Sequence, residues 1–158
     1  MRTRFHAYRR DLPHWRLEGA RYFVTWRLDP SQHELNPQER SLVLRALRFF
    51  DGVRYALFAC VVMNDHVHGI VCPEPERTLA SILHSWKSYT AHILTKEFGR
   101  SSKVWQHESY DHIVRDDTEY QHFYQYIRGN PSKRWPEIKE YPWLWLDEGI
   151  PSHMTTSA

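Results

Sequence analysis

Two kinds of hydrophobic pattern alternate along this sequence, and each predicts a different secondary structure. Short runs rich in aromatic and β-branched residues are typical of strands, because such side chains pack well on a pleated surface. Stretches whose apolar positions recur every three or four residues are typical of amphipathic helices. The short runs predict strands at 21–28, 54–63, 66–72 and 110–114, and the periodic stretches predict helices at 37–50, 78–98 and 118–129.

Capping residues and prolines indicate where these helices begin and end. Asn36 followed by Pro37 is a favourable start, because Asn accepts a free backbone N–H and Pro lacks one. Asp116 or Asp117 is expected to cap the third helix. Pro131 is expected to end that helix near Gly129, because the proline ring removes a backbone donor and disfavours helical dihedrals in the residue before it.

The order of elements is β-α-β-β-α-β followed by a further helix, which predicts an α+β protein with a ferredoxin-like antiparallel sheet. We expect the first two helices on one face of the sheet and the strand order 4-1-3-2. The length of 158 residues predicts one domain, 1–158, with a basic N-terminal arm at 1–19 and a C-terminal tail at 132–158. The Trp residues of the tail are expected to pack back on the domain.

Charge and composition narrow the functional classes only slightly. The formal net charge is +2, so no polybasic tail indicates a nucleic-acid partner, although aromatic residues reach 15%. Basic clusters among aromatic residues suit single-stranded nucleic acid, but a solvated basic face would look the same. The clustered residues are Arg2, Arg4, Arg9, Arg10, Arg16 and Arg21 near the N-terminus and Arg128, Lys133 and Arg134 later.

The cysteines and the hydropathy indicate the compartment. Cys60 and Cys72 lack the spacing of a zinc site, and reduced thiols are the simplest interpretation. No run approaches the roughly 20 apolar residues of a membrane span, and the basic N-terminus lacks the apolar stretch of a signal peptide. We therefore expect a cytoplasmic protein without a membrane partner.

His66 and His68 form the first candidate site. Residues i and i+2 of a strand share a face, so both imidazoles should point to one side of the predicted strand while Val67 packs on the other. Two adjacent imidazoles can hold one divalent metal ion. On this pattern alone, histidines with a structural or surface role are the more common outcome.

The last predicted helix adds a nucleophile and an oxygen ligand. Tyr126 and Asn130 are spaced i, i+4 and so share a helix face. Tyr126 could attack a substrate, and Asn130 could complete a metal site with the two histidines. Tyr120 and Tyr124, also spaced i, i+4, are rival nucleophiles, and packing on the sheet is their simpler interpretation.

These residues lie in motifs through which the chain resembles the REP-associated tyrosine transposases, relatives of the single-tyrosine HUH transposases of bacterial insertion sequences. The resemblance spans roughly residues 20 to 145, and the motifs occur in the order found in that family. They are Met63-Asn64-Asp65-His66-Val67-His68, Trp86-Lys87-Ser88, Val104-Trp105-Gln106, Tyr110-Asp111-His112-Ile113-Val114-Arg115 and Tyr126-Ile127-Arg128-Gly129-Asn130-Pro131. Ser132-Lys133-Arg134-Trp135 departs from the Val-Lys-Ala-Gly-Leu that often follows in the family.

The resemblance implies a metal-dependent endonuclease and strand transferase that acts on single-stranded DNA. Tyr126 would form a 5′-phosphotyrosine, and His66, His68 and Asn130 would hold Mg²⁺ or Mn²⁺. The implied substrate is a hairpin of repetitive extragenic palindromes, cut near a short flanking tetranucleotide. The resemblance favours a monomer acting in cis, with a dimer that exchanges tyrosine helices as the alternative.

Weaker expectations concern DNA contacts. Lys87 and Arg115 could bind phosphates, and the N-terminal arginines could contact DNA beside the cut, as basic arms do. The arm residues are Arg4, Arg9 and Arg10. His112 is expected to be a packed or hydrogen-bonded histidine and not a fourth ligand.

Two further functions compete with the first. A non-catalytic module of the same fold would bind hairpin or single-stranded DNA without cutting it. A metal hydrolase unrelated to DNA would use the histidines but leave the tyrosine without a role.

Overall fold

The computed structural model describes residues 19–101 and 103–147. The predicted order of elements is confirmed, and a short strand is added near the end. In chain order the elements are β1 (Arg21–Arg27), α3 (Pro37–Phe49), β2 (Tyr55–Val62), β3 (His66–Pro73), α4 (Leu79–Phe98), β4 (Tyr110–Val114), α5 (Asp117–Arg134) and β5 (Leu144–Leu146).

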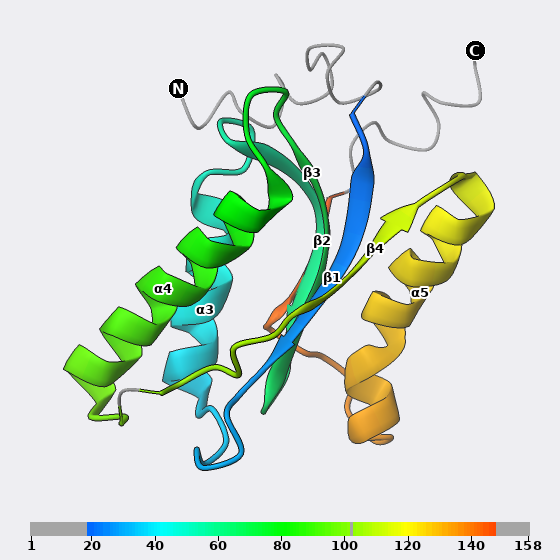
Figure 1. Ribbon diagram of the computed structural model, residues 1–158. Helices are drawn as coiled ribbons and strands as arrows, with labels where there is room; N and C mark the ends of the chain where they lie inside the picture. Colours follow the sequence, from blue (N-terminus) through cyan, green and yellow to red (C-terminus); the bar gives the residue numbers. More distant parts are fainter. Residues whose placement is uncertain (1–18, 102, 148–158) are drawn as a thin grey trace.

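The strands form one antiparallel sheet in the order β4-β1-β3-β2-β5. This order contains the expected 4-1-3-2 arrangement. β5 extends it, because Leu144 to Leu146 pair with Val61 to Ala59 of β2. Figure 1 shows α3 and α4 side by side on one face of the sheet and α5 alone on the other. The ferredoxin-like α+β fold is therefore confirmed.

Helices on both faces divide the interior into two cores. Side chains that alternate along β1 and β3 point to opposite faces, so Trp26 and Val67 pack in the core beneath α3 and α4. Phe23 and Ile70 pack with Ile127 in the core beneath α5. Every residue of β2 is buried, which explains its continuous apolar sequence.

The predicted helix starts are confirmed in detail. Asn36 Oδ1 accepts the backbone N–H of Glu39 at 2.8 Å, and Glu39 Oε1 accepts the backbone N–H of Asn36 at 2.9 Å. This reciprocal capping box satisfies two backbone donors at the start of α3. Asp116 caps α5 in a similar way, because Oδ1 accepts the N–H of Glu119 at 2.8 Å.

The predicted end of the last helix is wrong. Pro131 lies inside α5, which continues to Arg134, so Asn130 also keeps a helical backbone. Ile127 and Pro131 are both buried, and the N–H of Trp135 donates to the Pro131 carbonyl oxygen at 2.8 Å. Packing of the last turn on the sheet thus outweighs the local cost of proline.

Residues 135–147, the described part of the tail after α5, pack back on the domain, as expected. Tyr141 donates its hydroxyl to the Val62 carbonyl oxygen at 2.6 Å, and Trp143 Nε1 donates to Ser41 Oγ at 2.9 Å. Trp143 and Trp145 pack against the core beneath α3 and α4. In the part of the chain that the structure describes, no helix has the length and apolar character needed to cross a membrane.

Candidate active site

The two histidines of β3 lie on the face of the sheet that α5 covers. Val67 between them is fully buried in the opposite core, as the alternation predicts. The imidazole centroids of His66 and His68 are 4.6 Å apart. β3 is an inner strand, so this pair is held by hydrogen-bonded neighbours on both sides.

Each imidazole is oriented through its Nδ1 atom. His68 Nδ1 lies 2.7 Å from Thr25 Oγ1, because Thr25 of β1 is directly opposite His68 in the sheet. His66 Nδ1 lies 2.7 Å from Asp65 Oδ1. A carboxylate or hydroxyl that accepts the Nδ1 proton leaves the Nε2 lone pair available, which is the arrangement that metal-binding histidines require.

His68 is the more buried member of the pair. Its exposed fraction is 3%, and its Nε2 atom has no hydrogen-bond partner among the described residues. Burial, with smaller contributions from the nearby His66 and Arg27, lowers the pKa of His68 to about 3. The imidazole is therefore neutral near pH 7, as a metal ligand must be.

Tyr126 of α5 lies beside this pair. Its ring centroid is 5.2 Å from that of His68 and 6.0 Å from that of Phe23. Phe23 in turn stacks on Phe123 at 4.4 Å, which fixes α5 against the sheet. Tyr126 is 39% exposed, so part of this residue is accessible from solution.

A positively charged side chain lies against the ring of Tyr126. Lys133, two turns further along α5, places its Nζ atom 5.3 Å from the centre of the Tyr126 ring. This contact exists only because α5 continues past Pro131. A cation at this position attracts the negative charge of an approaching phosphate.

The rival tyrosines occupy a different part of α5. The Tyr120 ring packs against Phe58 at 5.8 Å, and the Arg21 guanidinium lies 4.6 Å from its centre. Tyr124 lies 5.9 Å from Tyr120. Both pack against the core beneath α5. Among the three tyrosines, the ring contact with His68 belongs to Tyr126.

Asn130 lies one turn after Tyr126 and is 7% exposed. It stands in the buried part of α5 between Ile127 and Pro131. The described residues contain no cluster of three or more His, Cys, Asp or Glu side chains that could hold a metal. Two imidazoles and the amide oxygen of Asn130 are nevertheless a donor set that suits a divalent ion, and the unpartnered Nε2 of His68 fits such a ligand role.

The predicted DNA-binding residues do not gather around Tyr126. Lys87 lies on α4, in the helical layer of the other face, and its Nζ donates to the His107 carbonyl oxygen at 2.9 Å and to Ser109 Oγ at 3.0 Å. Arg115 follows the end of β4 that pairs with Arg21, whereas His66 pairs with the opposite end of β1. Arg4, Arg9 and Arg10 lie outside the described residues.

His112 packs as expected. Its ring contacts Phe123 at 5.3 Å, and Nε2 lies 3.2 Å from the Glu119 carboxylate. The sequence reasoning missed Thr25 and Asp65, and it named Lys133 only as part of a basic cluster and not as a neighbour of Tyr126. Asp65 is adjacent to His66 and could have been noticed, whereas Thr25 needed the sheet register and Lys133 needed the true length of α5.

Sequence comparisons relate this chain to one protein family and to one relative. Residues 44–130, more than half of the chain, match the family model described as "Transposase IS200 like". An uncharacterized protein of Haemophilus influenzae is 30% identical over 105 residues, and the match spans 52% of this chain and 57% of that protein. The chain therefore spans little more than half the length of this relative.

A solved structure shares the fold. It is a REP-associated tyrosine transposase bound to a REP hairpin, with 23% sequence identity and a TM-score of 0.62. The match covers 80% of this chain and 76% of that one.

Proposed function

The chain belongs to the IS200-like transposase family, and on that premise we propose that it cuts and rejoins single-stranded DNA with Tyr126 as the nucleophile. The observation that carries this proposal is the 5.2 Å contact between the rings of Tyr126 and His68. It joins the candidate nucleophile of one helix to the candidate metal ligands of an inner strand. A surface tyrosine without a catalytic role would have no reason to lie beside two histidines that are each oriented through Nδ1.

In this proposal His66, His68 and Asn130 hold Mg²⁺ or Mn²⁺. The ion, when bound, would neutralise charge on the scissile phosphate and orient it for in-line attack. Thr25 and Asp65 contact the Nδ1 atoms of the two histidines and would leave both Nε2 atoms available to the ion. Because the Nδ1 contacts fix both rings before the substrate arrives, little reorganisation is needed on binding.

Tyr126 would then attack the phosphorus through its hydroxyl oxygen. The Tyr126 Oη–P bond forms as Oη loses its proton to water, the bond from phosphorus to the 3′-oxygen breaks, and that oxygen takes a proton from water to give a free 3′-hydroxyl. Lys133 stabilises the negative charge that the phenol develops as its proton leaves. The product is a 5′-phosphotyrosine, and a second 3′-hydroxyl can reverse the step, because the phosphodiester energy is retained in the covalent link.

The proposed partner is hairpin DNA of the REP type, since the solved relative in fold is bound to such a hairpin. We also propose that the monomer acts in cis. Tyr126 already lies beside His68 of its own chain, so no exchange of helices between copies is needed. Light scattering with and without DNA tests this, and a dimer would require the exchanged arrangement instead.

A cleavage assay tests the function. The full chain is incubated with a single-stranded hairpin oligonucleotide that carries flanking sequence, in Mg²⁺ or Mn²⁺. We expect a protein–DNA adduct that survives denaturation and a free 3′-hydroxyl fragment. A shifted but uncut oligonucleotide would identify the non-catalytic module, and absence of binding would favour a metal hydrolase unrelated to DNA.

A second prediction concerns the orientation of His68. Thr25→Val keeps the shape of the side chain but removes the hydroxyl that contacts Nδ1. We expect the affinity for Mn²⁺ to fall about 10- to 100-fold, the usual effect of losing a residue that orients a ligand. Calorimetric titration of the DNA-free protein measures this without relying on activity. Thr118→Val, at an exposed position of α5, is the matched control, and equal losses in both variants would contradict the role of Thr25.

A further inference from the structure

We propose that the groove between α4 and residues 103–109 binds the single-stranded DNA that flanks the cut, with Lys87 contacting a phosphate. This inference rests on the proposed function for the identity of the ligand. The groove itself lies on the α3–α4 face of the sheet, away from the face that carries Tyr126. It would guide the strand beyond the reacting phosphate and would not take part in the chemistry.

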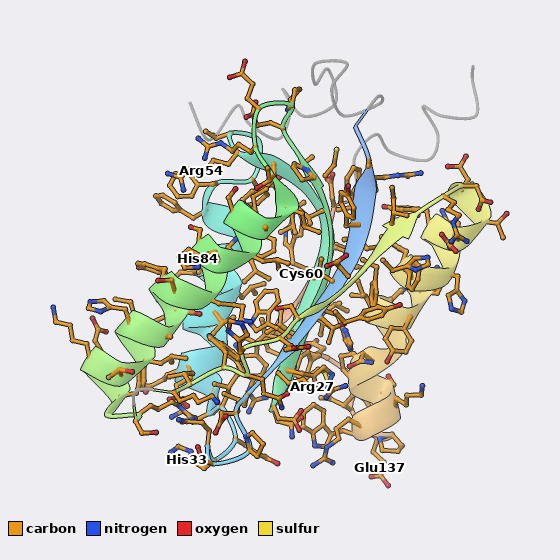
Figure 2. All side chains as sticks on the ribbon, viewed as in Figure 1. Arg27, His33, Arg54, Cys60, His84 and Glu137 are labelled. Atoms are coloured by element: carbon orange, nitrogen blue, oxygen red, sulfur yellow. The ribbon has the colours of Figure 1, made fainter. Side chains whose placement is uncertain are left out.

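The groove has a volume of about 620 Å³, and its lining is basic. Among the described residues, its lining contains no Asp or Glu. The polar side chains that face it include His84, Lys87, Ser88, Lys103, Gln106 and His107. Figure 2 shows His84 on α4, on the opposite side of the sheet from α5. A concave surface whose lining has cations and no carboxylates is complementary to a DNA backbone. Lys103 is paired with Asp29 at 3.6 Å, outside the lining, so Lys87 is the lysine of the groove that is expected to contact a phosphate.

The Lys87 ammonium has no carboxylate partner among the described residues. Its ammonium donates to the His107 carbonyl oxygen and to Ser109 Oγ, which are both neutral acceptors. An ammonium has three N–H groups, so one donor remains for a ligand. Burial lowers the pKa of Lys87, since part of its hydration is lost. A phosphate oxygen would supply the missing negative charge.

A second cavity adjoins this groove near the start of β3. Gln106 donates its backbone N–H to the Arg27 carbonyl oxygen at 2.9 Å and its side-chain amide to the Leu28 carbonyl oxygen at 3.0 Å. This second cavity, of about 270 Å³, is lined by Arg27 and Gln106 and also by the carboxylates of Asp29, Glu34 and Asp65, so the DNA backbone is expected to follow the first groove and not this cavity. Gln106 lines both cavities, and Asp65 precedes the first histidine. Figure 2 labels Arg27, the residue of β1 that pairs with His66.

The test measures how DNA affinity depends on salt. Fluorescence anisotropy follows a hairpin oligonucleotide with a single-stranded flank as it binds the full chain at several salt concentrations. Lys87→Gln is expected to raise the Kd and to reduce the slope of log K against log salt by about 0.7, the value for one lost phosphate contact on a single strand. Lys96→Gln, an exposed position of the same helix outside the groove, should leave the slope unchanged.

A second variant separates binding from local structure, because Lys87→Gln also removes two contacts to residues 107–109. Ser88→Glu adds a negative charge at an exposed position of the groove and leaves those contacts in place. We expect weaker binding of the flanked hairpin, with little change for a hairpin without the flank. Thr95→Glu, exposed on α4 outside the groove, is the matched control.

The outcomes distinguish this inference from the proposed function. Unchanged Kd and salt slope in both groove variants would overturn the groove, even where Tyr126 still forms an adduct. A lower slope in Lys87→Gln without any adduct from the wild-type chain would support the groove and overturn the cleavage chemistry. Equal weakening by groove and control variants would overturn the groove as a specific site.

Discussion

Tyr126→Phe should abolish the covalent protein–DNA adduct and leave hairpin binding close to that of the wild-type chain. The substitution removes a single oxygen atom, the one proposed to attack phosphorus. It keeps the ring that contacts His68 and Phe23. Removing a nucleophile typically lowers the rate by several orders of magnitude. Denaturing gel electrophoresis of the reaction with labelled oligonucleotide measures the adduct, and anisotropy measures binding.

The two other tyrosines of α5 provide the controls. Tyr120→Phe and Tyr124→Phe should both retain the adduct, because these rings pack with each other and Tyr120 also packs against Phe58. An adduct that persists in Tyr126→Phe and disappears in one of these variants would transfer the nucleophile to that residue. Loss of hairpin binding in Tyr126→Phe would mean that its hydroxyl serves recognition and not chemistry.

The sequence was sufficient for those parts of the site that depend on local periodicity. The i, i+2 spacing placed His66 and His68 on one face of a strand before the sheet was known. The i, i+4 spacing related Tyr126 to Asn130 on one helix. The order of elements led to the correct sheet topology, because few arrangements connect β-α-β-β-α-β without crossing.

The parts that the sequence did not predict depend on tertiary contacts. Pro131 carries a strong local signal for a helix end, yet the buried packing of Ile127 and Pro131 outweighs it and α5 continues to Lys133 and beyond. Thr25 becomes a partner of His68 only through the β1–β3 register. Lys87 and Arg115 have no periodic pattern that fixes their direction, and the structure places them away from Tyr126.

A buried ion pair between α3 and the residues just after α4 leads to the second large prediction. The guanidinium of Arg100 donates to both carboxylate oxygens of Glu39, at 2.6 and 2.7 Å, and both side chains are almost fully buried. It also donates to the carbonyl oxygens of His33 at 2.7 Å and Glu34 at 2.8 Å. Arg100 therefore ties the end of α4 to the loop that precedes α3.

The loop before α3 is hydrogen-bonded to Asn64, which lies in the turn between β2 and β3. Glu34 Oε2 accepts the side-chain amide of Asn64 at 3.0 Å, and the Leu35 N–H donates to the Asn64 carbonyl oxygen at 2.8 Å. Asp65, the next residue, orients His66. Loosening Arg100 should therefore reach the histidine pair through Glu34, Asn64 and the exposed Asp65.

We expect Arg100→Met to lower the free energy of unfolding by about 3–5 kcal/mol, the usual cost of leaving one partner of a buried pair without the other. Urea denaturation measures the loss, and Arg45→Met, exposed on α3, is the control. The double variant Glu39→Met with Arg100→Met should recover only part of the loss. It removes the unpaired carboxylate, but the carbonyl oxygens of His33 and Glu34 still lack their donor.

Acid provides an independent check on the same pair. Burial raises the pKa of Glu39, but hydrogen bonds from Arg100 and from the Asn36 backbone outweigh it and hold the pKa below its usual value of 4.5. A carboxyl whose pKa is lower in the folded state stabilises the fold above pH 4.5 and loses that contribution as the pH falls below it. Wild-type protein should therefore lose stability below about pH 4.5 more steeply than Arg100→Met. Equal acid dependence of the two proteins would show that Arg100 does not hold Glu39 in its ionised form.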